Sequence, residues 1–266
     1  MLKLILTLAL FTSLKALQCD IQSHSKYSCV CSTDTNNCSE AISEIPSLNK
    51  NDVMIYETNQ ASDERMKPIL MKDALNTSTS SGNPYIFKID LNKKFQKILG
   101  FGASFTDSGF LNMNSLQGSG KQEILEAYFG KSGIEYSMGR IPIASNDDSL
   151  RVYSYNDTPD DIDLKTFSID IDRSEETGYK LENIKTIVKL VKDSGKEINL
   201  FASPWSPPPW MTSTGKTIHN PKLKNDPAIK ASYVQYLKKF FEEYEKEGID
   251  FWGMTAQNEP DGNIGY

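Results

Sequence analysis

From residue 96 onward, short apolar segments alternate with amphipathic helical segments, and this order limits the chain to few folds. The apolar segments predict strands at 96–105, 136–145, 198–205 and 250–259. Between them, apolar residues recur at helical spacing in 121–130, 181–195 and 226–247. Each of these helical stretches ends at a glycine (Gly130, Gly195, Gly248). Strands that alternate with helices are typical of parallel α/β sheets and barrels.

The strand and helix count narrows the α/β class further. Four strands joined by three helices correspond to half of a (β/α)8 barrel, so the sequence predicts the first half of a TIM barrel over 96–266. The alternative is a doubly wound sheet with a phosphate-binding turn. The glycine-rich stretch "GFGASF" has the wrong spacing and context for that turn, which favours the barrel.

The first residues have the pattern of a secretory signal peptide, predicted over 1–16. Lys3 supplies the positive end, Leu4–Phe11 the apolar middle and Ala16 a small exit residue. The alternatives are a buried N-terminal helix or a short membrane anchor, although the apolar part is too short to span a bilayer. The sequence therefore predicts entry into the secretory pathway.

All four cysteines lie in the next segment, 17–48, which we predict to be a small disulfide-tied β unit. Cys19, Cys29, Cys31 and Cys38 allow two disulfides in three possible pairings. A zinc site is the alternative, but neither histidine is spaced to join it, so no metal is predicted. Three N-glycosylation sequons also indicate the secretory pathway; their acceptor residues are Asn37, Asn76 and Asn156.

Residues 49–95 predict part of an accessory β domain, of the sandwich type. The segments "VMIYETN" (53–59) and "YIFKIDL" (85–91) alternate in part, and the polar run between them predicts a loop. The net charge of the whole chain is −6. This acidic balance argues against a nucleic-acid partner, because phosphate neutralisation needs an excess of Lys and Arg.

Polar residues collect where the predicted barrel strands end. Thr106 and Asp107 follow the first strand. Arg140 lies within the second, which runs out into Asn146, Asp147 and Asp148. The third ends at Ser203, Pro204 and Trp205, and the fourth at Asn258, Glu259 and Pro260. Catalytic groups of barrel enzymes lie at the carboxyl ends of the strands, so these residues predict an active site on one rim.

The residue types at these ends point to a sugar substrate. Carboxylates and amides hydrogen-bond hydroxyl groups, and an indole such as Trp205 stacks on a sugar ring. The prolines of "SPWSPPPWM" hold Trp205 and Trp210 stiffly, although either tryptophan could instead be a packing residue. Glycoside hydrolysis needs a carboxyl group that protonates the leaving oxygen. Glu259 suits that role, with a surface salt bridge as its alternative, and Arg140 suits structural support.

Four segments together resemble one family: "KFQKILGFGASFTD", "GRIPIASNDDSLRVYSYNDTPDD", "NLFASPWSPPPWM" and "FWGMTAQNEP". They are similar to the glucosylceramidases of glycoside hydrolase family 30, over essentially the whole mature chain. The resemblance implies a barrel with an extra β domain and cleavage of the β-glucosyl bond of glucosylceramide with retention. It implies Glu259 as the acid/base, and Asn258, Asp147 and Trp205 as sugar-binding residues. Arg140 is implied as support.

The resemblance also implies disulfide pairings, partners and a compartment. The implied disulfides are Cys19–Cys29 and Cys31–Cys38. The family works in the lysosome with a saposin-type activator on an anionic lipid surface, and its reaction needs no cofactor. Secretion is the alternative localisation.

One departure from the family limits the expected activity. The family's nucleophile is a second glutamate on a later strand, whereas this chain stops just after the fourth. We therefore expect a truncated product with little or no activity alone. The alternatives are a related β-glycanase and a secreted, non-catalytic glycolipid-binding module.

Overall fold

A computed structural model of the protein shows two compact units. The described residues are 47–59, 61, 64–74, 90, 92–219 and 222–260. The predicted signal segment, the four cysteines, Asn37 and Asn76 lie outside them. The chain divides into the compact units Met1–Lys94 and Phe95–Tyr266. No helix within the described ranges is long and apolar enough to cross a membrane.

The described part of the first unit contains a β-hairpin of two antiparallel strands, β1 (Val53–Asn59) and β2 (Glu64–Met71). The prediction of a strand at 53–59 is confirmed. The prediction of a loop after it is wrong, because β2 lies there and pairs with β1. Charged residues and Pro68 hide the strand pattern, and a two-stranded hairpin tolerates proline because its strands have free edges. The expected strand at 85–91 falls almost entirely outside the described residues.

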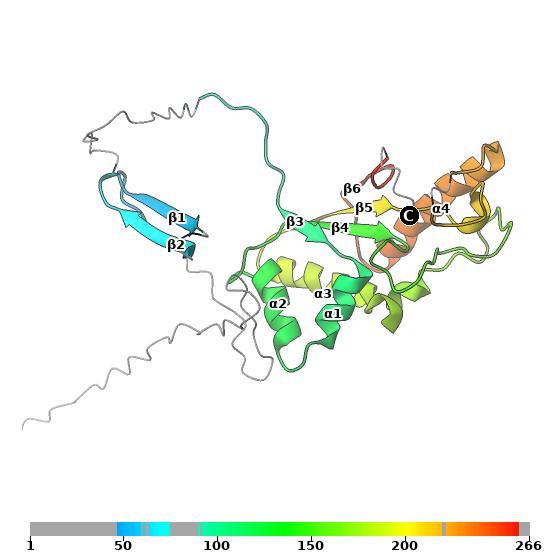
Figure 1. The fold of residues 1–266 in the computed structure, drawn as a ribbon, viewed down its shortest axis with the longest axis horizontal. Helices are drawn as coiled ribbons and strands as arrows, with labels where there is room; N and C mark the ends of the chain where they lie inside the picture. Colours follow the sequence, from blue (N-terminus) through cyan, green and yellow to red (C-terminus); the bar gives the residue numbers. More distant parts are fainter. Residues whose placement is uncertain are drawn as a thin grey trace, which may run out of the picture. The chain divides into compact units, whose positions relative to one another are not determined.

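The second unit contains a four-stranded sheet, built from β3 (Gly102–Ser104), β4 (Met138–Ile143), β5 (Asn199–Pro204) and β6 (Gly253–Met254). The strand order is β3-β4-β5-β6, and all three pairings are parallel. The predicted parallel α/β sheet is therefore confirmed, with its strands in chain order (Figure 1). The strands are shorter than predicted, most of all β6.

Among the described residues of this unit, four α-helices accompany the sheet: α1 (Asp107–Ser115), α2 (Gly120–Phe129), α3 (Lys180–Asp193) and α4 (Pro227–Lys246). Short 3-10 helices lie at Asp170–Arg173 (η2), Glu175–Thr177 (η3) and Pro209–Met211 (η4). The predicted helices at 121–130, 181–195 and 226–247 correspond to α2, α3 and α4. The sequence did not predict α1, which is polar and only weakly amphipathic. Its start is marked by Thr106, whose side chain accepts a hydrogen bond from the Gly109 amide.

The longest helix, α4, shows how the sequence fixes its own ends. The Asp226 side chain caps its first turn by accepting from the Ala228 amide at 2.7 Å. Pro227 occupies the first helical position, where its missing N–H costs nothing. Gly248, with φ of +77°, takes the left-handed conformation that follows the helix.

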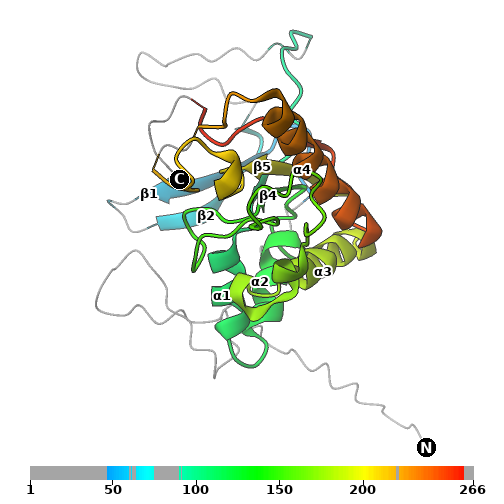
Figure 2. The ribbon, with the colours of Figure 1, turned by 90° about the vertical axis from the view of Figure 1, so that its right-hand side faces the viewer.

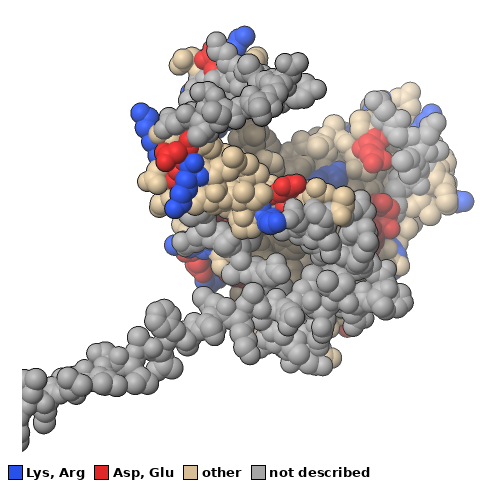
Figure 3. Space-filling model, turned by 60° about the vertical axis from the view of Figure 1, so that its left-hand side comes forward, with Lys and Arg blue, Asp and Glu red and all other residues tan. Residues whose placement is uncertain are grey.

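The helices pack on the sheet through one apolar core. In Figure 1, α1, α2 and α3 lie on one side of the strands, and Figure 2 shows α3 and α4 next to each other on the right, beside β4 and β5. The core joins residues of β4, α3, β5 and α4, for example Ile141, Ile187, Leu200 and Phe240. This layer fixes the strands, whose carboxyl ends carry polar residues. On the face shown in Figure 3, basic and acidic side chains of the described residues are interspersed.

Candidate active site

The carboxyl ends of the parallel strands meet at one pocket with a volume of about 260 Å³. The residues that line it are Ser104, Thr106, Arg140, Asn146, Asp147, Asp148, Trp205, Asn258 and Glu259. They come from β3, from β4 and its following loop, from β5, and from the segment after β6. Parallel strands end at the same edge of a sheet, so residues up to 155 positions apart in sequence share one pocket.

Arg140 lies at the centre of the contacts in this pocket. Its Nε donates to Ser203 Oγ at 3.0 Å, and its Nη2 donates to Asn258 Oδ1 at 2.5 Å. Its guanidinium carbon lies 4.5 Å from the centre of the Trp205 ring, within the range of a cation–π contact. Arg140 therefore ties β4 to the ends of β5 and β6.

Burial and charge act in opposite directions on Arg140. Burial lowers the pKa of the guanidinium from its usual value, and the nearby Glu259 and Asp147 carboxylates oppose that effect. The net shift is downward, but the usual value is so high that Arg140 stays cationic at physiological pH. The pocket thus holds a positive charge beside the Glu259 and Asp147 carboxyl groups.

Asp147 and Trp205 form one wall of the pocket. The Trp205 indole Nε1 donates to Asp147 Oδ1 at 3.1 Å, and the tryptophan side of this pair is only 8% exposed. Arg140 covers one face of the indole, so Trp205 shapes the wall and aligns Asp147. The Trp205 carbonyl in turn accepts from Gln257 Nε2 at 2.7 Å, which links this wall to the β6 end.

Asn258 and Glu259 are presented by a short turn after β6. The Asn258 amide donates to the Pro204 carbonyl at 2.9 Å, continuing the contact between β5 and β6. Glu259 has φ of +43°, in the left-handed region that non-glycine residues seldom occupy. Backbone strain of this kind clusters at functional sites. Here it turns an exposed glutamate towards a polar pocket.

The structure brings together the five residues predicted for the site: Arg140, Asp147, Trp205, Asn258 and Glu259. Trp210 is a packing residue, which was the alternative given for it from the sequence. It is buried in the core, and its indole N–H donates to the Asn156 carbonyl at 3.0 Å.

Two supporting residues, Thr255 and Gln257, were not singled out from the sequence, and Ser203 was placed at a strand end without a role of its own. Ser203 accepts from both Arg140 and Thr255 Oγ1, the latter at 2.7 Å. The signal was available, because all three lie in the carboxyl-terminal halves of the strands predicted at 198–205 and 250–259.

The sequon at Asn156 has an unusual environment. Asn156 is 1% exposed, and its Nδ2 donates to Asp161 Oδ2 and to Thr166 Oγ1, each at 2.9 Å. The nitrogen that would carry a glycan therefore already fixes the loop after β4. We expect this sequon to stay unmodified in the folded protein.

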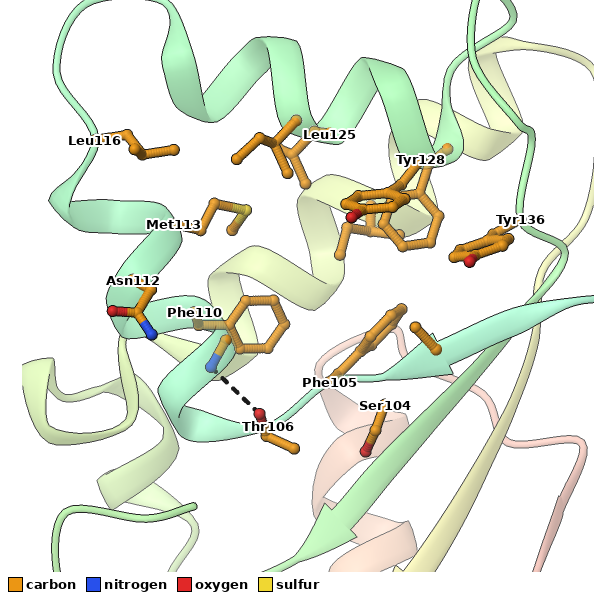
Figure 4. A pocket seen from close by; sticks show the side chains of 15 residues that line it. Ser104, Phe105, Thr106, Phe110, Asn112, Met113, Leu116, Leu125, Tyr128 and Tyr136 are labelled. Atoms are coloured by element: carbon orange, nitrogen blue, oxygen red, sulfur yellow. Dashed lines mark hydrogen bonds between the residues drawn. The ribbon is translucent and has the colours of Figure 1, made fainter. Parts of the chain in front are cut away.

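A second hollow, of about 410 Å³, lies between β3, α1 and α2 and has a different character (Figure 4). Its walls are mainly aromatic and aliphatic, including Phe105, Phe110, Leu125 and Tyr136. Its lining contains no carboxylate, histidine or cysteine. Within the described ranges, no group of three His, Cys, Asp or Glu residues is placed to hold a metal ion. Acid–base chemistry is thus supported by the smaller, polar pocket.

Comparison with known proteins agrees with this geometry. Residues 98–265 match the glycosyl hydrolase family 30 TIM-barrel domain. The chain is 38% identical over 231 residues to putative glucosylceramidase 3 of Caenorhabditis elegans, covering 87% of this chain and 43% of that protein. It is 38% identical to the lysosomal acid glucosylceramidase of Mus musculus, covering 68% of this chain and 34% of that protein.

A solved structure extends the comparison to the fold. The endo-beta1,6-glucanase BT3312 matches with a TM-score of 0.55 and 30% identity, covering 65% of this chain and 37% of that one. The chain spans less than half the length of the relatives it matches. Because the family match covers most of the chain and includes every pocket residue, the chain belongs to glycosyl hydrolase family 30.

Proposed function

We propose that this chain carries the glucose-binding residues and the acid/base carboxyl of a retaining β-glucosidase that cleaves glucosylceramide into glucose and ceramide. The observation that carries the proposal is the single pocket in which Glu259, Asn258 and Asp147 meet around Arg140. The similarity to glucosylceramidases supports the substrate.

Each pocket residue has a role that its geometry supports. Glu259, on the turn after β6, protonates the leaving glycosidic oxygen. Asn258 is held by Arg140 through its Oδ1, so its Nδ2 is left to donate to a sugar hydroxyl near the reacting carbon. Asp147, aligned by Trp205, accepts from sugar hydroxyls. Arg140 supports all three.

The proposed reaction needs a second carboxyl group. Retaining hydrolysis uses two carboxyls about 5 Å apart, one of which attacks the sugar. Among the described residues that line the pocket, Glu259 is the only glutamate, and the two aspartates follow β4 on a loop suited to binding. We therefore propose that the purified chain binds glucosides but turns them over slowly or not at all. Robust release of a fluorophore from an aryl β-glucoside would refute this part.

The cellular setting is proposed from the same similarity. We place the protein in the secretory pathway and the lysosomal lumen, acting at an anionic lipid surface with a saposin-type activator. Secretion is the alternative. Immunolocalisation against lysosomal markers distinguishes the two.

A related β-glycanase is the second candidate, favoured by the structural match to an endo-beta1,6-glucanase. The two candidates differ in what lies beyond the first glucose. We expect octyl β-glucoside, which has a lipid-like tail, to bind more tightly than gentiobiose, the β-1,6-linked glucose disaccharide. Tighter binding of gentiobiose would favour the glycanase.

Calorimetric titration with 1-deoxynojirimycin, a cationic glucose mimic, tests the site itself. We expect Asp147→Asn and Glu259→Gln each to weaken binding at least tenfold, since each removes a charged acceptor from the pocket. Asp163→Asn is the matched control, because that side chain is exposed and lies outside the pocket. Equal affinity in all four proteins would contradict the proposed site.

A further inference from the structure

A buried charge cluster lies behind the pocket, apart from the residues that line it. Lys180, the first residue of α3, is fully buried with Asp107 and Asp172. Lys180 Nζ lies 2.9 Å from Asp107 Oδ1 and 3.2 Å from Asp172 Oδ1. It also donates to Tyr153 OH at 3.0 Å. Buried charges must be paired, and this cluster satisfies that need with one cation between two carboxylates.

The second oxygen of Asp107 points to the loop that follows β4. Asp107 Oδ2 accepts from Ser149 Oγ at 2.6 Å and from Tyr153 OH at 3.0 Å. Ser149 has a single hydroxyl proton, and the short distance assigns it to the charged acceptor. Ser149 and Tyr153 lie on the carboxyl-terminal side of Asp147, so one carboxylate holds that side of the loop at two points.

The loop between Ala144 and Tyr153 is also closed on itself. Ser145 Oγ donates to the Tyr153 carbonyl at 2.8 Å and accepts from the Tyr153 amide at 3.0 Å. The Asn146 amide donates to Ser149 Oγ at 3.1 Å. Asp147 therefore lies at the tip of a closed loop, and Asp107 is its anchor to α1.

We propose that Asp107 is a positioning residue: its buried carboxylate, through Ser149 and Tyr153, fixes the loop that places Asp147 against Trp205. The consequence for sugar binding rests on the proposed function. The consequence for the Asp147–Trp205 hydrogen bond does not, because that bond exists without a sugar.

Lys180 stays charged beside Asp107. Burial alone would favour its neutral amine, but the attraction of Asp172, Asp107 and the tyrosine oxygens outweighs burial and raises the pKa of Lys180 well above its usual value. The lysine thus stays cationic in the acidic to neutral range, and Asp107 keeps its partner across it.

Two indole N–H groups report on the proposal without a ligand. Trp205 Nε1 donates to Asp147, on the loop, whereas Trp210 Nε1 donates to the Asn156 carbonyl. Hydrogen exchange of both, followed by NMR on 15N-tryptophan-labelled chain, separates local loosening from global unfolding. We expect Ser149→Ala to accelerate exchange at Trp205 at least tenfold and to leave Trp210 unchanged. Ser149→Thr, which keeps the hydroxyl, should restore slow exchange.

Asp107→Asn and Asp172→Asn form the matched pair of variants. Both remove one charge from the same buried cluster, but Asp172 Oδ2 accepts from Tyr155 and Tyr244 rather than from the loop. We expect Asp107→Asn to accelerate exchange at Trp205 more than at Trp210, and Asp172→Asn to affect both equally. Unchanged Trp205 exchange in Ser149→Ala, or equal patterns in the two aspartate variants, would overturn the proposal.

The affinity of the same variants for 1-deoxynojirimycin tests the effect of the loop on sugar binding. We expect Ser149→Ala to weaken it at least threefold, with Ser149→Thr near the unmutated value. If the unmutated chain does not bind this sugar mimic, the proposed function fails, and the exchange data still decide whether Asp107 positions the loop.

Discussion

Replacing Lys180 by methionine should be among the most damaging single changes in the second unit. Methionine keeps most of the aliphatic stem but removes the ammonium group that contacts Asp107, Asp172 and Tyr153. Two carboxylates would then remain buried without a cation. Removing one partner of a buried ion pair costs about 3 to 5 kcal/mol of unfolding free energy.

The same loss can be expressed as a melting temperature. A domain of this size loses about 2 to 4 °C for each kcal/mol, so Lys180→Met should lower the melting temperature by about 6 to 20 °C. Urea unfolding followed by circular dichroism measures the free energy, and a thermal scan measures the midpoint.

A matched lysine on the same helix provides the control. Lys189 pairs with Asp193 on the surface and is 75% exposed. Exposed pairs contribute less than about 1 kcal/mol, so Lys189→Met should unfold almost as the unmutated chain does. If Lys180→Met costs no more than Lys189→Met, the buried cluster does not stabilise the fold as argued here.

Further predictions concern packing, acid stability and glycosylation. A Cβ at Gly139 in β4 would lie 2.7 Å from ring atoms of Phe105, so Gly139→Ala should destabilise by about 1 to 3 kcal/mol through overpacking, measurable by urea unfolding. Hydrogen bonds from Arg173 and Lys185 lower the pKa of Glu247 to about 2. The stability that Glu247 contributes is therefore present above about pH 4.5 and lost as the pH falls towards 2; Glu247→Gln should flatten that part of the stability curve. Mass spectrometry of glycopeptides should find Asn156 unmodified, and a fully occupied Asn156 in folded protein would contradict its buried geometry.

Periodicity revealed the parts of the fold that are amphipathic. Helix α3 could be predicted because Leu181, Ile184 and Ile187 lie on one face, and the structure buries all three. Helix α1 could not, because "DSGFLNMNS" is short and has few apolar residues, although Phe110 and Met113 from it are buried in the core. Strand β2 could not be predicted because it contains charged residues and Pro68. A two-stranded hairpin also need not have a continuous apolar face, so its strands lack the alternating pattern that identifies a strand in sequence.

The site residues could be predicted where polar or aromatic side chains stand at the end of a predicted strand. Glu259, Asn258 and Trp205 stand directly after apolar segments, and the structure gathers them in one pocket. The link between Asp107 and Ser149 joins residues 42 positions apart, so only the folded chain shows it. Trp210 and Asn156 show the opposite limit: the sequence left a packing role open for Trp210 and offered a glycosylation site at Asn156, and the structure buries both in a contact with each other.

We propose that glucose binds between Asp147 and Glu259, and a crystal structure of the chain with 1-deoxynojirimycin would show whether it does. We expect the sugar mimic in the pocket at the ends of β4, β5 and β6, with its hydroxyls within hydrogen-bond distance of Asp147 and Asn258 and its ring beside Glu259. Density for the compound in the apolar hollow of Figure 4, with the polar pocket empty, would contradict the account.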